Sequence, residues 1–181
     1  FRFAAQLEFT LDASLEPLMG KAAPQLVQVS GERLRDELVA ICATDRAGVA
    51  MTSLNAVGAM DAIFPELIPG RGMDQGPFHH LDVLGHQLET VHQSDRILAS
   101  YAEFSEPLQG PLNAYCSEQL VERRTRKSLI KLSGLLHDVG KPSSRQVHED
   151  GDIWFIGHEH TGAQLATPVA QRLRFSNRET H

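Results

Sequence analysis

The hydrophobic positions of this chain recur mostly at helical spacing. Apolar residues three and four positions apart predict helices over residues 1–9, 11–23, 29–43, 47–63, 80–101, 117–138 and 157–175. Asp12 and Ser30 are candidate N-caps for two of these helices, and Pro168 is a possible kink in the last one. Residues 102–116 contain prolines and a glycine, so this segment is predicted to form a loop.

One segment leaves the helical period. Residues 145–156 place an Asp-Gly turn between two β-prone arms, the pattern of a β-hairpin. The chain is therefore predicted to be mainly α, a helical bundle with one small β-hairpin at about residues 145–156. A Gly/Pro-rich stretch at 69–77 is the best candidate boundary, and it separates a part at 1–69 from a part at 76–181.

Composition narrows the possible classes of protein. With 41% hydrophobic residues, the 181-residue chain can build a real core. Its net charge of -6 argues against a surface tuned throughout for nucleic acid, although local basic patches stay possible. Cys42 and Cys116 form no metal or redox pattern, which is typical of a cytoplasmic protein, and no apolar run is long enough to span a membrane.

Both ends of the sequence indicate part of a longer protein. The chain begins at Phe1 inside an amphipathic pattern, and Ser176 and Glu179 near its end have the spacing of a capping box, a helix start with no helix expected after it.

Candidate chemistry concentrates in GLLHDVGKP, residues 134–142. His137 and Asp138 stand side by side at the end of an apolar helix, where an uncompensated carboxylate is costly. Gly140 is expected to adopt the left-handed conformation that closes a helix, and Pro142 to prevent its continuation. Both side chains could then reach one target beyond the last helical turn.

Other histidines begin or occupy the neighbouring predicted helices. If the helices at 80–101, 117–138 and 157–175 pack together, His86, His158 and His160 approach the His137–Asp138 pair. Imidazoles with a carboxylate suit a divalent metal such as Mn or Ni better than Mg. The metal would activate water for attack on phosphorus, and Lys141 could neutralise a phosphate. Taken singly, each histidine is accounted for as well by packing, solvation or helix capping.

A basic run at the start of the predicted helix 117–138 is a candidate RNA-binding surface. Its members are Arg123, Arg124, Arg126, Lys127 and Lys131. These cations could contact RNA phosphates. An ordinary solvated helix face accounts for them equally well, because Glu118 and Glu122 lie at spacings that allow pairing with Arg126.

The motifs together resemble a known family. LLHDVGKP, with His86 upstream in DVLGHQLETV, is similar to the HD-domain superfamily of metal-dependent phosphohydrolases. FRFAAQLEFTLD, VSGERLRDEL, PFHHLDVLGHQLETV, LLHDVGKP and GHEHTGAQLATPVAQRLRFSN occur in this order and resemble bacterial tRNA nucleotidyltransferase/poly(A) polymerase proteins over nearly the whole chain. The resemblance implies a helical neck and body region at 1–69, with the polymerase head absent, and an HD domain at 76–181 that is truncated at its C-terminus.

The resemblance also assigns roles to residues. It implies the metal ligands His86, His137 and Asp138, with His158 as a possible ligand of a second metal. It places the last aspartate of the HD pattern beyond His181, because Asp150 and Asp152 belong to the hairpin turn. It implies that a further set supports the nucleotide site of the full-length protein: Arg2, Glu32, Arg33 and Arg35.

Three functions follow as hypotheses. The first is the C-terminal portion of an RNA 3′-end nucleotidyltransferase, which transfers nucleotides from ATP or CTP to RNA and carries a metal-dependent HD phosphohydrolase domain. The 181 residues alone are not expected to polymerise, because the polymerase carboxylates are absent. The second is a stand-alone HD phosphohydrolase or cyclic phosphodiesterase, and the third is a non-catalytic RNA-binding module.

Overall fold

The computed structural model describes residues 1–77, 79–100, 106–121 and 124–180. In chain order its elements are α1 (Arg2–Gln6), η1 (Ala13–Leu15), α2 (Glu16–Ala22), η2 (Ala23–Gln28), α3 (Gly31–Cys42), α4 (Ala47–Ala56), α5 (Ala59–Ile63), η3 (Pro65–Gly70), α6 (Val83–Ser100), α7 (Glu106–Ser117), β1 (Gln119–Val121), β2 (Arg124–Thr125), α8 (Arg126–Leu136), α9 (Lys141–Ser144), β3 (Gln146–Val147), β4 (Ile153–Trp154), α10 (His158–Arg172) and α11 (Asn177–Thr180), where η marks a 3₁₀ helix.

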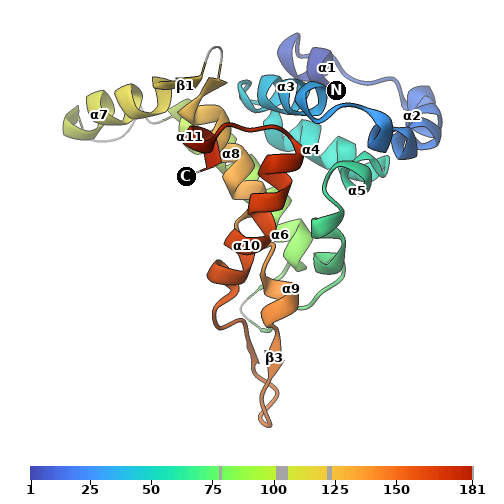
Figure 1. Cartoon of the computed structure of the whole chain (residues 1–181), viewed down its shortest axis with the longest axis vertical. Coiled ribbons are helices and arrows are strands. Elements are labelled where there is room, and N and C mark those ends of the chain that lie inside the picture. Colours follow the sequence, from blue (N-terminus) through green and yellow to red (C-terminus); the bar gives the residue numbers. More distant parts are fainter. Residues whose placement is uncertain (78, 101–105, 122–123, 181) are drawn as a thin grey trace.

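The long helices α6 and α8 pack against each other at the centre of the molecule. Helix α4 packs on α6 and α3 packs on α8, so the N-terminal helices cover one side of this pair. Figure 1 shows the hairpin of β3 and β4 at one end of the long axis and α7 projecting sideways near the other end. Helix α10 runs from the hairpin back along the centre (Figure 1).

A single hydrophobic core joins the two halves of the chain. Its most buried members from the first half include Leu38, Met51 and Phe64, and those from the second half include Leu135 and Leu173. Burial of each such side chain stabilises the fold by about 1.5–3 kcal/mol. The core therefore continues across the Gly/Pro-rich stretch at 69–77, and the division there stays a prediction.

The mainly α fold and the 145–156 hairpin are confirmed. Strands β3 and β4 pair antiparallel, with Gln146 opposite Trp154 and Val147 opposite Ile153. The prediction of only one hairpin is wrong, because β1 and β2 also pair antiparallel. The helix predicted from residue 117 consequently begins at Arg126.

The loop predicted at 102–116 is corrected from residue 106 onward. Residues 106–117 form α7, while 102–105 lie outside the described residues. Pro107 occupies the first turn, where its missing N–H is not needed for helical bonding, and Pro111 in the interior removes one backbone hydrogen bond.

Helix starts follow the predicted caps. Asp12 Oδ1 accepts a hydrogen bond from the Ser14 amide at 2.8 Å. Ser30 is the N-cap of α3, although its side chain makes no capping bond. The capping box forms at α11, where Glu179 Oε2 accepts from the Ser176 amide at 2.8 Å. The expectation that no helix follows it is wrong, because the short helix α11 does. Among the described helices, none has the length and apolarity that a membrane span requires.

Candidate metal centre

The His137–Asp138 pair lies in a tight connection between two helices. Helix α8 ends at Leu136, and His137 is its C-cap in a right-handed helical conformation. Gly140 also has right-handed dihedral angles, φ -82° and ψ -15°, and Pro142 lies in the first turn of α9. The predicted left-handed Gly140 is therefore wrong, because the chain passes through right-handed turns into α9. Helix α8 does not continue through Pro142, which lies in this separate helix.

Gly140 is needed for close packing instead. A Cβ atom added there would lie 2.1 Å from the carbonyl oxygen of His158 and 2.4 Å from the amide nitrogen of Gly162. The first turn of α10 thus rests directly on the backbone of Gly140. This contact carries His158 to the side of Asp138.

Gly140→Ala is expected to destabilise the protein by roughly 3 kcal/mol, at the upper end of the range for overpacking, because the atoms in the way belong to backbone. Thermal or urea unfolding measures the loss. The matched control is Gly110→Ala in α7, where a Cβ meets nothing within 4 Å. That change should stabilise slightly, as alanine favours a helix interior by roughly 0.5–1 kcal/mol. Equal effects at both positions would contradict the packing argument.

A second glycine brings α6 to α8. A Cβ atom on Gly134 would lie 3.2 Å from Thr90 Cγ2, so the two helices approach closely one turn before His137. His86, on α6, then faces the end of α8. The His86 and His137 ring centroids are 5.2 Å apart.

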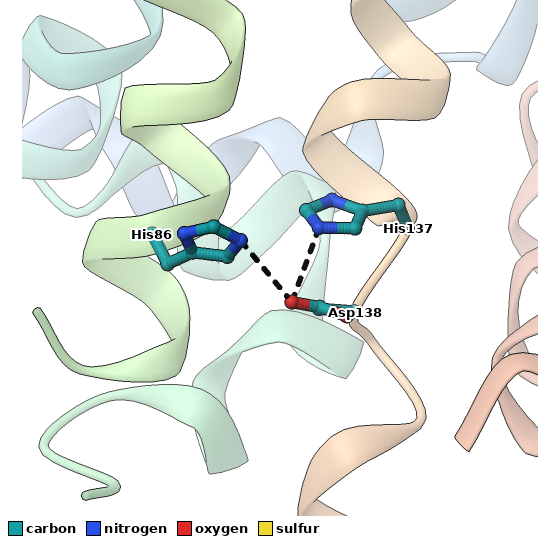
Figure 2. Close-up of side chains that lie close together, drawn as sticks. All are labelled: His86, His137 and Asp138. Atoms are coloured by element: carbon teal, nitrogen blue, oxygen red, sulfur yellow. Dashed lines mark ion pairs between the residues drawn. The ribbon is translucent and has the colours of Figure 1, made fainter. Parts of the chain in front are cut away.

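The two imidazoles converge on one carboxylate oxygen. Nε2 of His86 lies 3.4 Å from Asp138 Oδ2, and Nε2 of His137 lies 3.1 Å from the same atom. Figure 2 shows both rings directed at this oxygen from separate helices. One ligand atom from each of the three residues falls within 4.8 Å of the others, the only such metal-capable group among the described residues. The structure thus brings together the three residues that the sequence predicted as metal ligands.

His158 approaches the other oxygen of the same carboxylate. Its Nε2 lies 3.3 Å from Asp138 Oδ1. His160, in contrast, is largely exposed and has only Glu159 close by among the described ionisable groups. The structure therefore places His158, but not His160, at the centre.

Backbone carbonyls fix the orientation of two rings. Nδ1 of His137 lies 2.8 Å from Gly134 O, and Nδ1 of His158 lies 2.7 Å from Phe155 O. Because each Nδ1–H donates to its carbonyl, the neutral form of each ring directs its Nε2 lone pair at Asp138. A lone pair facing a carboxylate oxygen is favourable only with a proton or a cation between them. The arrangement therefore suits a bound metal, and the acceptors that create it are backbone atoms that no sequence motif reveals.

Burial and nearby cations set the charge of Asp138. Its side chain is 3% exposed, and Oδ2 receives no well-directed hydrogen bond from the described residues. Lys141 Nζ lies 2.7 Å from Oδ2 and donates to Gln75 Oε1 at 2.7 Å. Burial would raise the pKa of Asp138, but the contacts from His137 and Lys141 outweigh it and hold that pKa well below its usual range. Asp138 is therefore ionised and available as a ligand.

The pKa values of His86 and His137 are shifted in opposite directions. The Asp138 carboxylate beside it raises the pKa of His137, whereas burial lowers the pKa of His86.

Gln75, which holds Lys141 in place, was not predicted, because it lies in the Gly/Pro-rich stretch, where nothing in the sequence signals a contact to Lys141.

Residues 83–180 match the protein family described as HD domain. The chain belongs to the HD domain family. HD domains are metal-dependent, and the His86, His137 and Asp138 group is one that could hold a metal. Residues 8–70 match a second family, described as the probable RNA and SrmB-binding site of polymerase A.

Curated relatives extend the similarity beyond the HD domain. The chain is 34% identical to an A-adding tRNA nucleotidyltransferase of Deinococcus radiodurans and 30% identical to a CC-adding tRNA nucleotidyltransferase of Thermus thermophilus, over 96% of its length in both cases. It spans 36% of the length of each relative. The resemblance to the tRNA nucleotidyltransferase family is confirmed, and a stand-alone HD protein is not favoured.

The described members of the basic run ahead of the HD metal centre do not form an unpaired face. Lys131 is fully buried, and its Nζ lies 2.6 Å from Asp95 Oδ1, so its prediction as an RNA contact is wrong. Arg124 pairs with Glu179 at 2.8 Å, and Arg126 pairs with Glu118.

Lys127 lies 2.8 Å from Asp45, and Arg123 lies outside the described residues. An RNA-binding role for Arg124, Arg126 and Lys127 stays a prediction. Each described member of the run has an acidic partner.

The residues assigned to nucleotide-site support lie on α1 and α3, away from the HD centre. Arg2 Nε donates to Glu37 Oε2 at 2.7 Å, and Arg35 donates to the carbonyl oxygen of Arg174 at 2.5 Å. Glu32 faces Arg174 at 3.7 Å. Arg33 lines a surface pocket beside Arg2. Their role stays a prediction.

Proposed function

We propose that the HD domain of this chain is a metal-dependent phosphohydrolase whose ion is held by His86, His137 and Asp138. The observation that carries the proposal is the pair of Nε2 atoms directed at a buried, ionised carboxylate oxygen within 3.4 Å. This donor set favours a first-row divalent metal such as Mn or Ni over Mg. When bound, such an ion supplies Lewis acidity and a water that is ionised near neutral pH.

The surrounding residues have distinct tasks in this proposal. Asp138 supplies negative charge, and the Gly134 carbonyl keeps His137 in the tautomer that binds metal. Lys141, held between Asp138 and Gln75, offers a fixed positive charge to a phosphoryl oxygen. His158 faces the opposite carboxylate oxygen, where it is suited to a second ion.

Metal removal tests this function. After treatment with EDTA, the protein should not hydrolyse bis(p-nitrophenyl) phosphate, and Mn²⁺ or Ni²⁺ should restore hydrolysis better than Mg²⁺. The reason is that imidazole ligands bind first-row divalent metals more tightly than they bind Mg²⁺. Hydrolysis that persists without metal would contradict the proposal.

We propose further that the whole protein is an RNA 3′-end nucleotidyltransferase that uses ATP or CTP and RNA. Support comes from the similarity over 96% of the chain to A-adding and CC-adding tRNA nucleotidyltransferases. In this proposal residues 1–69 form the neck and body that contact RNA, and 76–181 form the HD domain. A cytoplasmic location fits the free, buried thiols of Cys42 and Cys116.

The 181 residues alone should not extend RNA. Polymerase-type sites hold Mg²⁺ through carboxylates and substrate phosphates, whereas the one metal-capable group among the described residues has two imidazoles and a single carboxylate. The measurement is incorporation of labelled ATP or CTP into tRNA that lacks its terminal CCA. Incorporation by this chain would overturn the expectation.

A further inference from the structure

Lys141 shares one atom of Asp138 with the two imidazoles of the metal centre. Its Nζ lies 2.7 Å from Asp138 Oδ2, the same oxygen at which Nε2 of His86 and Nε2 of His137 are directed. Lys141 is only 8% exposed, so solvent screens its charge weakly. An ammonium and a divalent ion repel each other, and the two therefore compete for this oxygen.

The ammonium of Lys141 has a second acceptor in Gln75. Nζ donates a hydrogen bond to Gln75 Oε1 at 2.7 Å, whereas Asp138 Oδ2 receives no well-directed hydrogen bond from the described residues. The contact with Asp138 is thus an attraction between charges, and the contact with Gln75 fixes a direction. Phe155 gives support that does not depend on Asp138, because its ring centre lies 5.3 Å from Nζ.

The amide of Gln75 is oriented in advance toward Lys141. Gln75 is 4% exposed, and its Nε2 donates to the carbonyl oxygen of Leu81 at 3.2 Å, which leaves Oε1 as the atom that faces the ammonium. The turn that carries Gln75 is fixed as well. The Gly76 amide donates to Asp74 Oδ1 at 3.0 Å, and Gly76 has a left-handed φ of 90°.

We propose that Gln75 is a positioning residue that keeps the Lys141 ammonium beside the metal centre while a metal takes the place of that ammonium at Asp138 Oδ2. The inference rests on the proposed phosphohydrolase function and explains how one site holds both an ion and a lysine. Gln75 lies outside both matched ranges, 8–70 and 83–180, so neither family match includes it. Held on Gln75, the ammonium remains available to a phosphoryl oxygen.

The metal affinity of the EDTA-treated protein tests this role without reference to hydrolysis. Gln75→Met keeps the length of the side chain and removes the acceptor, so Lys141 has only Asp138 to contact. Mn²⁺ should then bind roughly 10-fold more weakly, at the lower end of the range for groups that support metal ligands. Lys141→Met removes the competing charge, and Mn²⁺ should bind more tightly by a similar factor. Calorimetric titration measures both affinities.

The double variant separates positioning from damage to the turn. When Lys141→Met is already present, adding Gln75→Met should leave the Mn²⁺ affinity unchanged, because no ammonium remains to be held. If Gln75 acted only through its bond to Leu81, its loss would weaken binding equally in both backgrounds, and that result would overturn the proposal. Gln93→Met is the matched control, since Gln93 is exposed on α6 and donates to Glu89. Circular dichroism verifies that each variant is folded.

A crystal structure of the wild type with Mn²⁺ gives a readout that needs no variant. Lys141 Nζ should remain within hydrogen-bonding distance of Gln75 Oε1 and should lie farther from Asp138 Oδ2 than the present 2.7 Å. An unchanged contact with Oδ2, or loss of the contact with Gln75, would overturn the proposal.

Failure of the inference differs from failure of the proposed function. If the wild type binds Mn²⁺ and hydrolyses bis(p-nitrophenyl) phosphate, but Gln75→Met leaves the affinity unchanged, the role of Gln75 is removed and the phosphohydrolase is kept. The expected pattern of affinities without any hydrolysis would keep the role of Gln75 in metal binding and remove the phosphohydrolase. Absence of Mn²⁺ binding by the wild type would overturn both.

Discussion

Asp138→Ala is expected to lower the affinity for Mn²⁺ or Ni²⁺ by more than 100-fold and to abolish metal-dependent phosphoester hydrolysis. Asp138 is the point on which His86 and His137 converge, and it is the one carboxylate of the group. Changes in groups that merely orient metal ligands already cost roughly 10- to 100-fold in affinity or activity, so loss of a direct ligand should exceed that range. Calorimetric titration of the EDTA-treated protein measures the affinity.

Two further variants make the result specific. Asp138→Ala leaves Lys141 buried without its carboxylate, so circular dichroism must show that the variant is folded. His86→Ala avoids this problem, because the His86 side chain is 34% exposed and it too should lower metal affinity. His160→Ala is the matched control on α10, with a side chain that is 86% exposed. Unchanged metal affinity in both Asp138→Ala and His86→Ala would eliminate this group as the site.

Metal affinity should also depend on pH with a definite sign. The carboxylate of Asp138 raises the pKa of His137, so the protonated ring persists to a higher pH than in a free histidine. A metal must displace that proton, and affinity therefore falls as the pH falls through this pKa. Titrations at several pH values measure the effect.

The metal centre was predictable from sequence where chemistry dictated residue type. A carboxylate beside an imidazole at the end of an apolar helix needs a cationic partner to offset its burial, which pointed to His137 and Asp138. His86 followed from the family motif. The geometry of the metal centre was not predictable. It depends on the carbonyls of Gly134 and Phe155, which orient two of the rings, and on the close approach of α10 at Gly140. Backbone atoms and tertiary distances leave no residue pattern.

In the fold, too, features set by a local sequence pattern were predictable, and features set by tertiary contacts were not. The β3–β4 hairpin was evident because an Asp-Gly turn separated two β-prone arms. Strands β1 and β2 were hidden, because they are only three and two residues long and run directly into the helical period of α8. Lys131 was misplaced since a lysine among other cations predicts an exposed face, and its buried partner Asp95 is distant in sequence.

Lys131 and Asp95 form an ion pair inside the protein, where α8 meets α6. The Lys131 side chain is fully buried and that of Asp95 is 7% exposed. Lys131 Nζ also donates to Thr44 O at 2.5 Å, and Asp95 Oδ2 accepts from the Gly48 amide at 2.7 Å. The pair therefore joins the end of α3 and the start of α4 to the two central helices.

Lys131→Met is expected to destabilise the protein by about 3–5 kcal/mol, because it leaves the Asp95 carboxylate buried without its cation. For a protein of this size that corresponds to a fall in Tm of roughly 6–20 °C. Lys127→Met is the matched control on the same helix, since its partner Asp45 is 55% exposed. An exposed pair contributes about 0–1 kcal/mol, so this control should change little.

The double variant Lys131→Met/Asp95→Asn separates the cost of an unpaired charge from the worth of the pair. An amide at position 95 carries no charge to leave unpaired, and its oxygen can still accept from the Gly48 amide. The double variant should therefore be more stable than Lys131→Met alone, although it has lost both charges. Urea unfolding of the four proteins in the cycle gives the interaction energy. If the double variant were as unstable as Lys131→Met, the damage would come from the packing of the lysine stem, and the ion pair would not be what holds α3, α4, α6 and α8 together.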